Sequence, residues 1–130
     1  MGRKTYEEIL GFGVEWPYSN CKSTIVTSKI NYKTQTENTR VLNKVDTKVI
    51  NEIKAIGNKN IWVVGGGQLI SEFLNYDAID EMTISMMPII LGKGVPLFPN
   101  NPKETKFELI NTESFETGIV NLTYKKKVGA

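Results

Sequence analysis

The chain has 130 residues, of which 40% are hydrophobic and 23% are charged, so its composition is that of one soluble globular domain. Its 16 basic and 14 acidic residues leave a net charge of +2, which gives no electrostatic basis for binding nucleic acid or an anionic membrane. The absence of histidine and the presence of a single cysteine, Cys21, argue against a zinc site, an internal disulfide and an imidazole-activated thiol.

The first half of the chain predicts short helices and strands in alternation. A helix is expected at residues 4–10, ended by Gly11, then a loop rich in Gly and Pro over 11–20, a strand at 23–28, and a short strand at Val41 and Leu42. Residues 46–57 predict an amphipathic helix, capped by Asp46 or Thr47 and closed by Gly57.

The second half predicts a buried strand, a helix and then three more strands. The predicted strand at residues 60–64 contains the unbroken apolar run 61–64, which is typical of a parallel strand, and helical spacing follows from Leu69 to Leu74. A long strand over 81–91, a loop over 91–99 and a hairpin of 107–114 with 118–126 complete the chain. The order predicts one α/β domain, residues 1–130, with a mostly parallel sheet flanked by helices and an antiparallel hairpin at its C-terminal end.

No apolar run approaches the roughly 20 residues of a membrane span, and no signal-peptide pattern opens the chain. Cys21 is expected to be structural. Together these features favour a reducing cytoplasm. Lysines 125–127 are expected to form a solvated tail, since no basic face or aromatic platform accompanies them.

Three consecutive glycines, 65–67, lie between the predicted strand and helix. Ordering such a segment costs conformational entropy, and bare backbone there lets a ligand approach the free N–H groups at the start of the helix. A phosphate is the ligand expected at this junction, and a tight strand-to-helix turn without a ligand is the alternative. The spacing matches neither the Rossmann fingerprint nor the P-loop.

Two other segments suggest anion contacts. Arg3 and Thr5 stand at the start of the first helix, and Thr27, Ser28 and Lys29 end a strand, where open α/β sheets bind ligands. Each group also has an ordinary explanation, as a surface charge, a helix cap or polar strand-end residues. Three such places in one small domain predict a ligand with several phosphates, such as a dinucleotide.

The segments MGRKTYE, TIVTSK, WVVGGGQLISEFL and DEMTISMMPIILGKGVPLFP, in this order, resemble the dihydrofolate reductase-like superfamily, closest to its riboflavin-biosynthesis reductase domains. The resemblance covers nearly the whole chain. It implies NADPH as cofactor and hydride transfer to a pterin- or pyrimidine-like heterocycle, as in dihydrofolate reductase or the phosphoribosylaminouracil reductase of riboflavin biosynthesis.

The resemblance also implies roles for individual residues. Arg3 and Thr5 would meet NADPH phosphates, and Thr27, Ser28 and Lys29 would hold the phosphate on the adenosine ribose. The pyrophosphate and nicotinamide would lie along the glycine junction, which comprises Val64, Gly65, Gly66, Gly67, Gln68 and Leu69. A cis peptide bond between Gly65 and Gly66 is expected.

Two departures weaken dihydrofolate as the substrate. Ile70 stands where folate reductases usually carry tyrosine, and the extension PIILGKGVPLF is of the riboflavin type. In that branch the extension commonly makes subunit contacts, so residues 86–91 are expected either at a homodimer interface or as a buried strand of a monomer.

In the superfamily a strand, an active-site loop and a helix precede the GRKTYE motif and usually carry the carboxylate that protonates the substrate. We therefore expect a domain incomplete at its N-terminus, with no catalytic acid that can be named and with Glu7 and Glu8 in solvent. Unpaired strand edges would require another copy to cover the gap or the sheet to rearrange. Three functions stay open: a reductase, a dinucleotide-binding module without turnover, and an inactive fragment.

Overall fold

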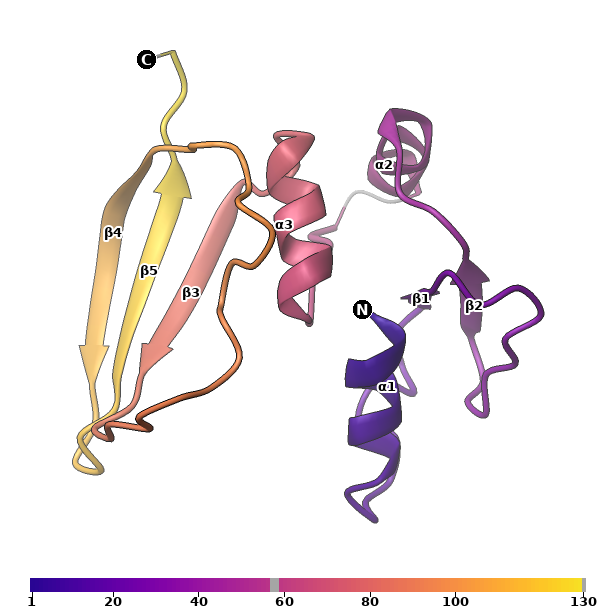
Figure 1. Ribbon diagram of the computed structural model, residues 1–130, viewed down its shortest axis with the longest axis horizontal. Coiled ribbons are helices and arrows are strands. Elements are labelled where there is room, and N and C mark those ends of the chain that lie inside the picture. Colours follow the sequence, from indigo (N-terminus) through magenta and orange to yellow (C-terminus); the bar gives the residue numbers. More distant parts are fainter. Residues whose placement is uncertain (57–58, 130) are drawn as a thin grey trace.

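The computed structural model describes residues 1–56 and 59–129. The elements run in the order α1 (Arg3–Leu10), β1 (Ser23–Val26), β2 (Thr39–Leu42), α2 (Thr47–Ala55), α3 (Gly67–Asn75), β3 (Glu81–Met86), β4 (Phe107–Ser114) and β5 (Val120–Lys126). Figure 1 shows β3, β4 and β5 on one side of α3 and the earlier elements on the other. Within the described ranges, no helix is long and apolar enough to cross a membrane.

The helices begin and end where local sequence predicts. Gly11 caps α1, and its N–H donates to the carbonyl oxygens of Glu7 and Glu8. The Asp46 carboxylate accepts a 2.9 Å hydrogen bond from the N–H of Val49, so Asp46 is the N-cap of α2. The prediction that Gly57 closes α2 falls outside the described residues.

β1 and β2 form a parallel pair, with Ser23 opposite Thr39 and Val26 opposite Leu42. On the other edge of β1, Gly2 makes an isolated parallel bridge with Val26. The N-terminal amine donates to the Thr24 carbonyl at 2.8 Å, and the N–H of Val26 donates to the Met1 carbonyl at 2.9 Å. Met1 and Gly2 therefore occupy the position of a third strand beside β1.

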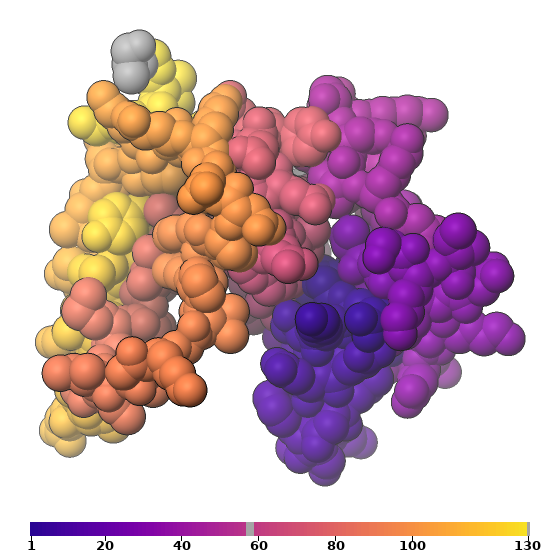
Figure 2. Space-filling model, in the orientation of Figure 1, coloured from indigo at the N-terminus to yellow at the C-terminus, as the bar shows by residue number. Residues whose placement is uncertain are grey.

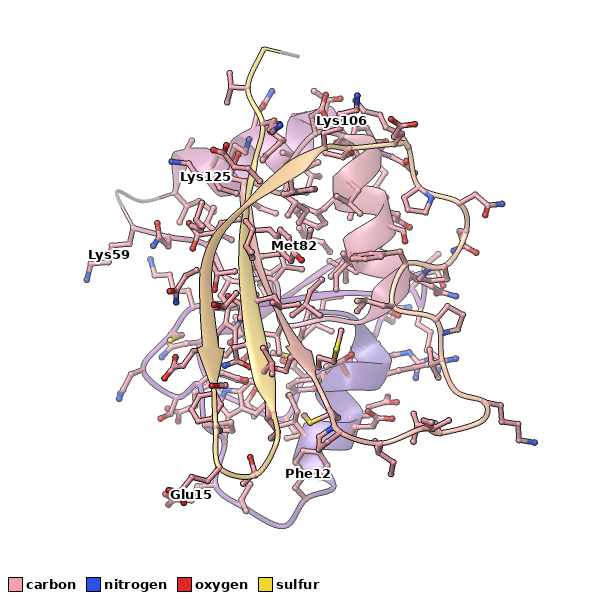
Figure 3. The ribbon with its side chains drawn as sticks, turned by 90° about the vertical axis from the view of Figure 1, so that its left-hand side faces the viewer. Phe12, Glu15, Lys59, Met82, Lys106 and Lys125 are labelled. Carbon is pink, nitrogen blue, oxygen red and sulfur yellow. The ribbon has the colours of Figure 1, made fainter. Side chains whose placement is uncertain are left out.

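β3, β5 and β4 form an antiparallel sheet with β5 in the middle, which confirms the predicted C-terminal hairpin. One face is polar: the Thr83 and Thr123 hydroxyls lie 3.2 Å apart, and Ser85 donates to Asn121 at 2.7 Å. Met82 lies on the opposite face, which packs against α3 (Figure 3). This alternation follows from the period of two along a strand.

The core is small and centred on α3. Its buried members come from α2, α3 and the segment before β3: Ile50, Leu69, Phe73, Leu74 and Ile79. Helix α3 therefore joins the two halves of the molecule, which separate toward the lower part of Figure 2. Tyr6 and Ile25 are fully buried in the N-terminal half, apart from this cluster.

The prediction of a strand at residues 60–64 is wrong. The segment belongs to neither sheet, and Ile61 and Trp62 are 49% and 71% exposed rather than buried. A groove of about 1170 Å³ separates it from β1, and a groove of about 830 Å³ separates it from β3. A strand needs a hydrogen-bonding neighbour, and neither groove supplies one. The expectation of one mostly parallel sheet fails for the same reason, since the described residues form two separate sheets.

Strand β3 ends at Met86 rather than at residue 91. Pro88 has no N–H to donate to a ladder, so the chain leaves the sheet there. The segment 87–98 is a loop with strongly exposed apolar side chains, among them Ile89, Ile90, Leu91 and Val95.

Cys21, expected to be a structural thiol, is exposed.

Candidate functional site

Gly2 joins the three places that the sequence singles out. Its N–H donates a 2.8 Å hydrogen bond to the Gly65 carbonyl, and it bridges Val26, the residue before Thr27. The start of α1, the end of β1 and the glycine junction are therefore neighbours. Carboxyl ends of parallel strands and helix N-termini commonly meet in this way at ligand sites of α/β proteins.

Gly65 and Gly66 provide open backbone beside Thr5. Gly65 has φ +128°, a conformation that favours glycine, and its peptide bond to Gly66 is cis, as the resemblance implies. A Cβ atom at Gly66 would lie 3.3 Å from the Thr5 hydroxyl oxygen. The absence of side chains here lets the Thr5 hydroxyl lie directly against the junction.

At position 67 glycine is required for a different reason. A Cβ atom there would lie 2.9 Å from both the Leu97 carbonyl oxygen and Cδ of Pro99. The Ser71 hydroxyl fastens the same loop by donating to the Pro99 carbonyl at 2.6 Å. Loop packing, rather than a ligand, therefore requires the third glycine, a reason that its position in the sequence does not reveal.

The N-terminus of α3 retains free donors. Gly66 is the N-cap without any side-chain cap, and the helical ladder begins with the N–H of Ile70 donating to the Gly66 carbonyl. Within residues 1–56 and 59–129, the N–H groups of Gly67, Gln68 and Leu69 donate to no protein acceptor. The Leu69 side chain is buried in the core, so Leu69 can contact a ligand only through its backbone N–H. This helix start provides a partial positive charge suited to an anion.

Arg3 is held by Glu7, which is exposed, as the sequence predicts. The Arg3 guanidinium donates from Nη1 to Glu7 Oε2 at 2.8 Å, and the Tyr32 hydroxyl donates to Glu7 Oε1 at 3.1 Å. The hydrogen bond from Arg3 holds the pKa of Glu7 below its usual range. Partial burial, and next the bond to Glu7, raise the pKa of Tyr32. A spacing of four residues on a helix is typical of an ion pair such as that of Arg3 with Glu7. No nearby sequence pattern indicates that Tyr32 contacts Glu7.

The end of β1 forms a tight polar turn. Thr27 is buried, and its hydroxyl oxygen accepts from the Lys29 N–H at 3.1 Å. The Asn43 side-chain amide donates to the carbonyls of Thr27 and Lys29, each at 3.0 Å. The turn presents Ser28 and Lys29 as exposed side chains, whereas Thr27 is buried and its hydroxyl oxygen accepts one hydrogen bond within the turn. Asn43 is a residue of the site that sequence patterns do not reveal.

Four aromatic rings lead from α1 to the segment before the glycines. Tyr6, Trp16, Tyr18 and Trp62 pack edge to face in succession, with ring centroids 5.1, 5.2 and 5.6 Å apart. Such edge-to-face pairs are favourable for aromatic quadrupoles. Trp62 ends the row beside both grooves, and it precedes Gly65 by three residues. A ligand that extended from the glycine junction into either groove would therefore approach its indole.

The RibD C-terminal domain model matches residues 16–121 of the chain. The chain is 33% identical to the uncharacterized protein YwjB of Bacillus subtilis (strain 168) over 120 residues, which are 92% of this chain and 68% of that protein. It is 36% identical to the uncharacterized protein YyaP of the same organism over 75 residues, 58% of this chain and 40% of that protein.

Two solved structures share the fold. A protein of Shewanella sp. PV-4, assigned to riboflavin biosynthesis, superposes with a TM-score of 0.87 at 31% identity and matches 98% of this chain and 72% of its own. A pyrimidine reductase-like protein of Corynebacterium diphtheriae superposes with a TM-score of 0.73 at 15% identity over 98% of this chain and 75% of its own.

Proposed function

Because the chain belongs to the RibD C-terminal domain family, we propose that it is a reductase that transfers hydride from NADPH to a pyrimidine- or pterin-like heterocycle. The observation that carries the proposal is the convergence of α1, the end of β1 and the glycine junction around Gly2. A dinucleotide has phosphates at separated positions, which matches three neighbouring groups of donors better than a single anion does.

The residues at this convergence suit NADPH. When bound, NADPH supplies the hydride, and the protein provides binding, orientation and electrostatics. The N–H groups of Gly67–Leu69 would bind the pyrophosphate, and Arg3 with Thr5 would contact phosphate oxygens. Ser28 and Lys29 would bind the phosphate on the adenosine ribose, which NADH lacks. The free donors at α3, the side-chain-free Gly65–Gly66 segment and the exposed end of β1 support these proposed roles.

The strand edges beside the two grooves support a further part of the proposal. All residues from Glu81 to Ser85 line the groove next to β3, although neighbouring side chains on a strand point to opposite faces. The edge of β3, with its backbone donors and acceptors, therefore borders this groove. We propose that both grooves accept additional strands, the places that in the superfamily are taken by the segment before the GRKTYE motif, which carries the group that protonates the substrate.

The exposed loop 87–98 supports a homodimer. Its apolar side chains include Ile90, which is 97% exposed, and its single charged residue is Lys93. The exposed apolar side chains of this loop, together with Met86 and Phe115, present an apolar area on the order of 800 Å². Each partner contributes an area of that size to a standard interface. A two-fold pairing of this surface with itself would cover it in both copies.

A second candidate is a module that binds the dinucleotide without turnover. The open grooves beside Trp62 favour it, because water would reach the nicotinamide side of the site and hydride transfer needs a water-excluding pocket. A test that addresses the shared binding step is NADPH titration of the Lys29→Ala and Lys4→Ala variants. We expect Lys29→Ala to bind NADPH about tenfold more weakly. Lys4→Ala, which changes the exposed neighbour of Arg3, should bind NADPH as the wild type does. Measuring NADPH oxidation with pyrimidine substrates then separates the two candidates.

A further inference from the structure

Glu7 is the centre of a polar cluster built from separate parts of the chain. One carboxylate oxygen accepts from Arg3 of the same helix at 2.8 Å, and the other accepts from Tyr32, which lies in the loop between β1 and β2, at 3.1 Å. Lys29 is close enough for its charge to contribute to the lowered pKa of Glu7. The carboxylate therefore connects the start of α1 with the turn after β1.

The cluster leaves most of the Arg3 guanidinium available. A guanidinium has five N–H donors, and the ion pair with Glu7 uses Nη1. The Arg3 side chain is 22% exposed, so the remaining donors are reachable from solvent. Because Tyr32 holds the far oxygen of Glu7, the carboxylate and the guanidinium are fixed together. The Arg3–Glu7 pair is neutral and the Lys29 ammonium adds a positive charge nearby, so the cluster still attracts an anion.

We propose that Glu7, anchored by Tyr32, is a positioning residue that fixes the Arg3 guanidinium in the orientation needed to bind a dinucleotide phosphate. This role rests on the proposed function, because Arg3 must meet a phosphate for its orientation to matter. An arginine that is already held loses less rotamer freedom when it binds than a free one does. An isolated exposed pair spaced by four residues would contribute little, whereas Tyr32 ties this one to a second segment.

The proposal predicts different effects for two substitutions at position 7. Glu7→Ala removes both acceptors and is expected to weaken NADPH binding about three- to tenfold. Glu7→Gln keeps one side-chain oxygen for Arg3, and its amide can donate to the Tyr32 hydroxyl oxygen, so it is expected to restore affinity to within about twofold of the wild-type value. Tyr32→Phe removes the anchor but leaves the ion pair, and an intermediate loss is expected. Glu8→Ala is the matched control, because Glu8 is exposed on the same helix and its side chain makes no hydrogen bond within the described residues.

A second readout does not need the cofactor. In the NADPH-free chain, NMR of the arginine side chains should show slow rotation and protected N–H signals for Arg3. Both features should disappear in Glu7→Ala and persist in Glu7→Gln. Folding of each variant is checked by its urea unfolding curve, since a lost ion pair at the surface should change stability little.

The outcomes separate this role from the function on which it rests. If wild-type protein binds NADPH and Arg3→Ala weakens binding while Glu7→Ala does not, the positioning role is overturned and the proposed function stands. If the folded wild-type protein does not bind NADPH, the proposed function is overturned, and the positioning role with it. Weakened binding by Glu7→Ala, rescue by Glu7→Gln and loss of the Arg3 NMR signals in Glu7→Ala together support the role.

Discussion

The N–H of Gly2 donates a 2.8 Å hydrogen bond to the carbonyl of Gly65, although the two glycines lie at opposite ends of the N-terminal half of the chain. This bond places Arg3 and Thr5 next to the glycine junction, and the bridge from Gly2 to Val26 adds the turn at Thr27–Lys29. The candidate site is therefore assembled by backbone pairing, which keeps its side chains available for a ligand.

Substituting Gly67 by alanine tests the packing that closes the N-terminus of α3. A Cβ atom would lie 2.9 Å from the Leu97 carbonyl oxygen, so loop and helix would have to move apart. We expect Gly67→Ala to lower the free energy of unfolding by about 1–3 kcal/mol in urea titrations. Gly94→Ala is the control in the same loop, since its nearest contact would be an ordinary 3.5 Å and no loss is expected. Equal stability of the two variants would contradict the packing role of Gly67.

Acid should destabilise the folded protein. A hydrogen bond from the Val49 N–H lowers the pKa of Asp46, and a hydrogen bond from Lys103 lowers the pKa of Asp77. A carboxyl group with a lowered pKa stabilises the fold above its unfolded-state pKa, near 4, and loses this effect as pH falls through its folded-state pKa. We expect the urea midpoint to fall as pH decreases below about 4.

Asp46→Asn serves as the comparison for this pH dependence. Asparagine is also a good N-cap but does not titrate, so the helix start is preserved. The urea midpoint of this variant should fall less steeply below about pH 4 than that of wild type. Parallel curves for the two proteins would exclude Asp46 as a source of the acid sensitivity.

The local predictions are accurate where a few adjacent residues determine the structure. Gly11 ends α1, Asp46 begins α2, and the hairpin forms around residues 115–118. The failures involve partners distant in sequence. Residues 60–64 have the composition of a buried strand, but no strand of the described part of the chain pairs with them. Tyr32 and Asn43 act through contacts across loops, which no spacing rule indicates.

The three glycines illustrate the same limit. Their position between a predicted strand and a helix correctly indicates an uncapped helix N-terminus and, with the resemblance, the cis bond between Gly65 and Gly66. The pattern does not distinguish Gly66, which lies against Thr5, from Gly67, which accommodates the loop at Leu97. That distinction depends on a loop about thirty residues further along the chain.

A strand added before Met1 tests the interpretation of the grooves. Met1 and Gly2 already pair with β1, so an added segment of about eight strand-forming residues should continue along the same edge. We expect slower amide exchange at residues 62–64 and, in a Trp16→Phe background, a shift of Trp62 emission to shorter wavelength. A Gly-Ser extension of equal length is the control. The same exchange rates with both extensions would contradict the proposal that this groove accepts a strand.

The exposed loop 87–98 gives a test of the homodimer. Ile90→Glu with Val95→Glu places two like charges in the exposed apolar surface, which would then face each other across a two-fold interface. Sedimentation is expected to show a dimer for wild type and a monomer for the double variant. Lys93→Ala leaves the apolar surface intact and should remain dimeric. A wild-type monomer at micromolar concentration would contradict the dimer.

The most direct test of the central claim is titration of the folded chain with NADPH and with NADH, followed by the fluorescence of Trp62 in a Trp16→Phe background, where it is the single tryptophan. Trp62 lies three residues before Gly65, so a nicotinamide at the glycine junction should quench its emission. We predict saturable quenching by NADPH and at least about tenfold weaker binding of NADH, because Ser28 and Lys29 would contact the additional phosphate. Equal affinity for the two dinucleotides would contradict the role of that turn, and no binding of either by folded protein would contradict the dinucleotide site itself.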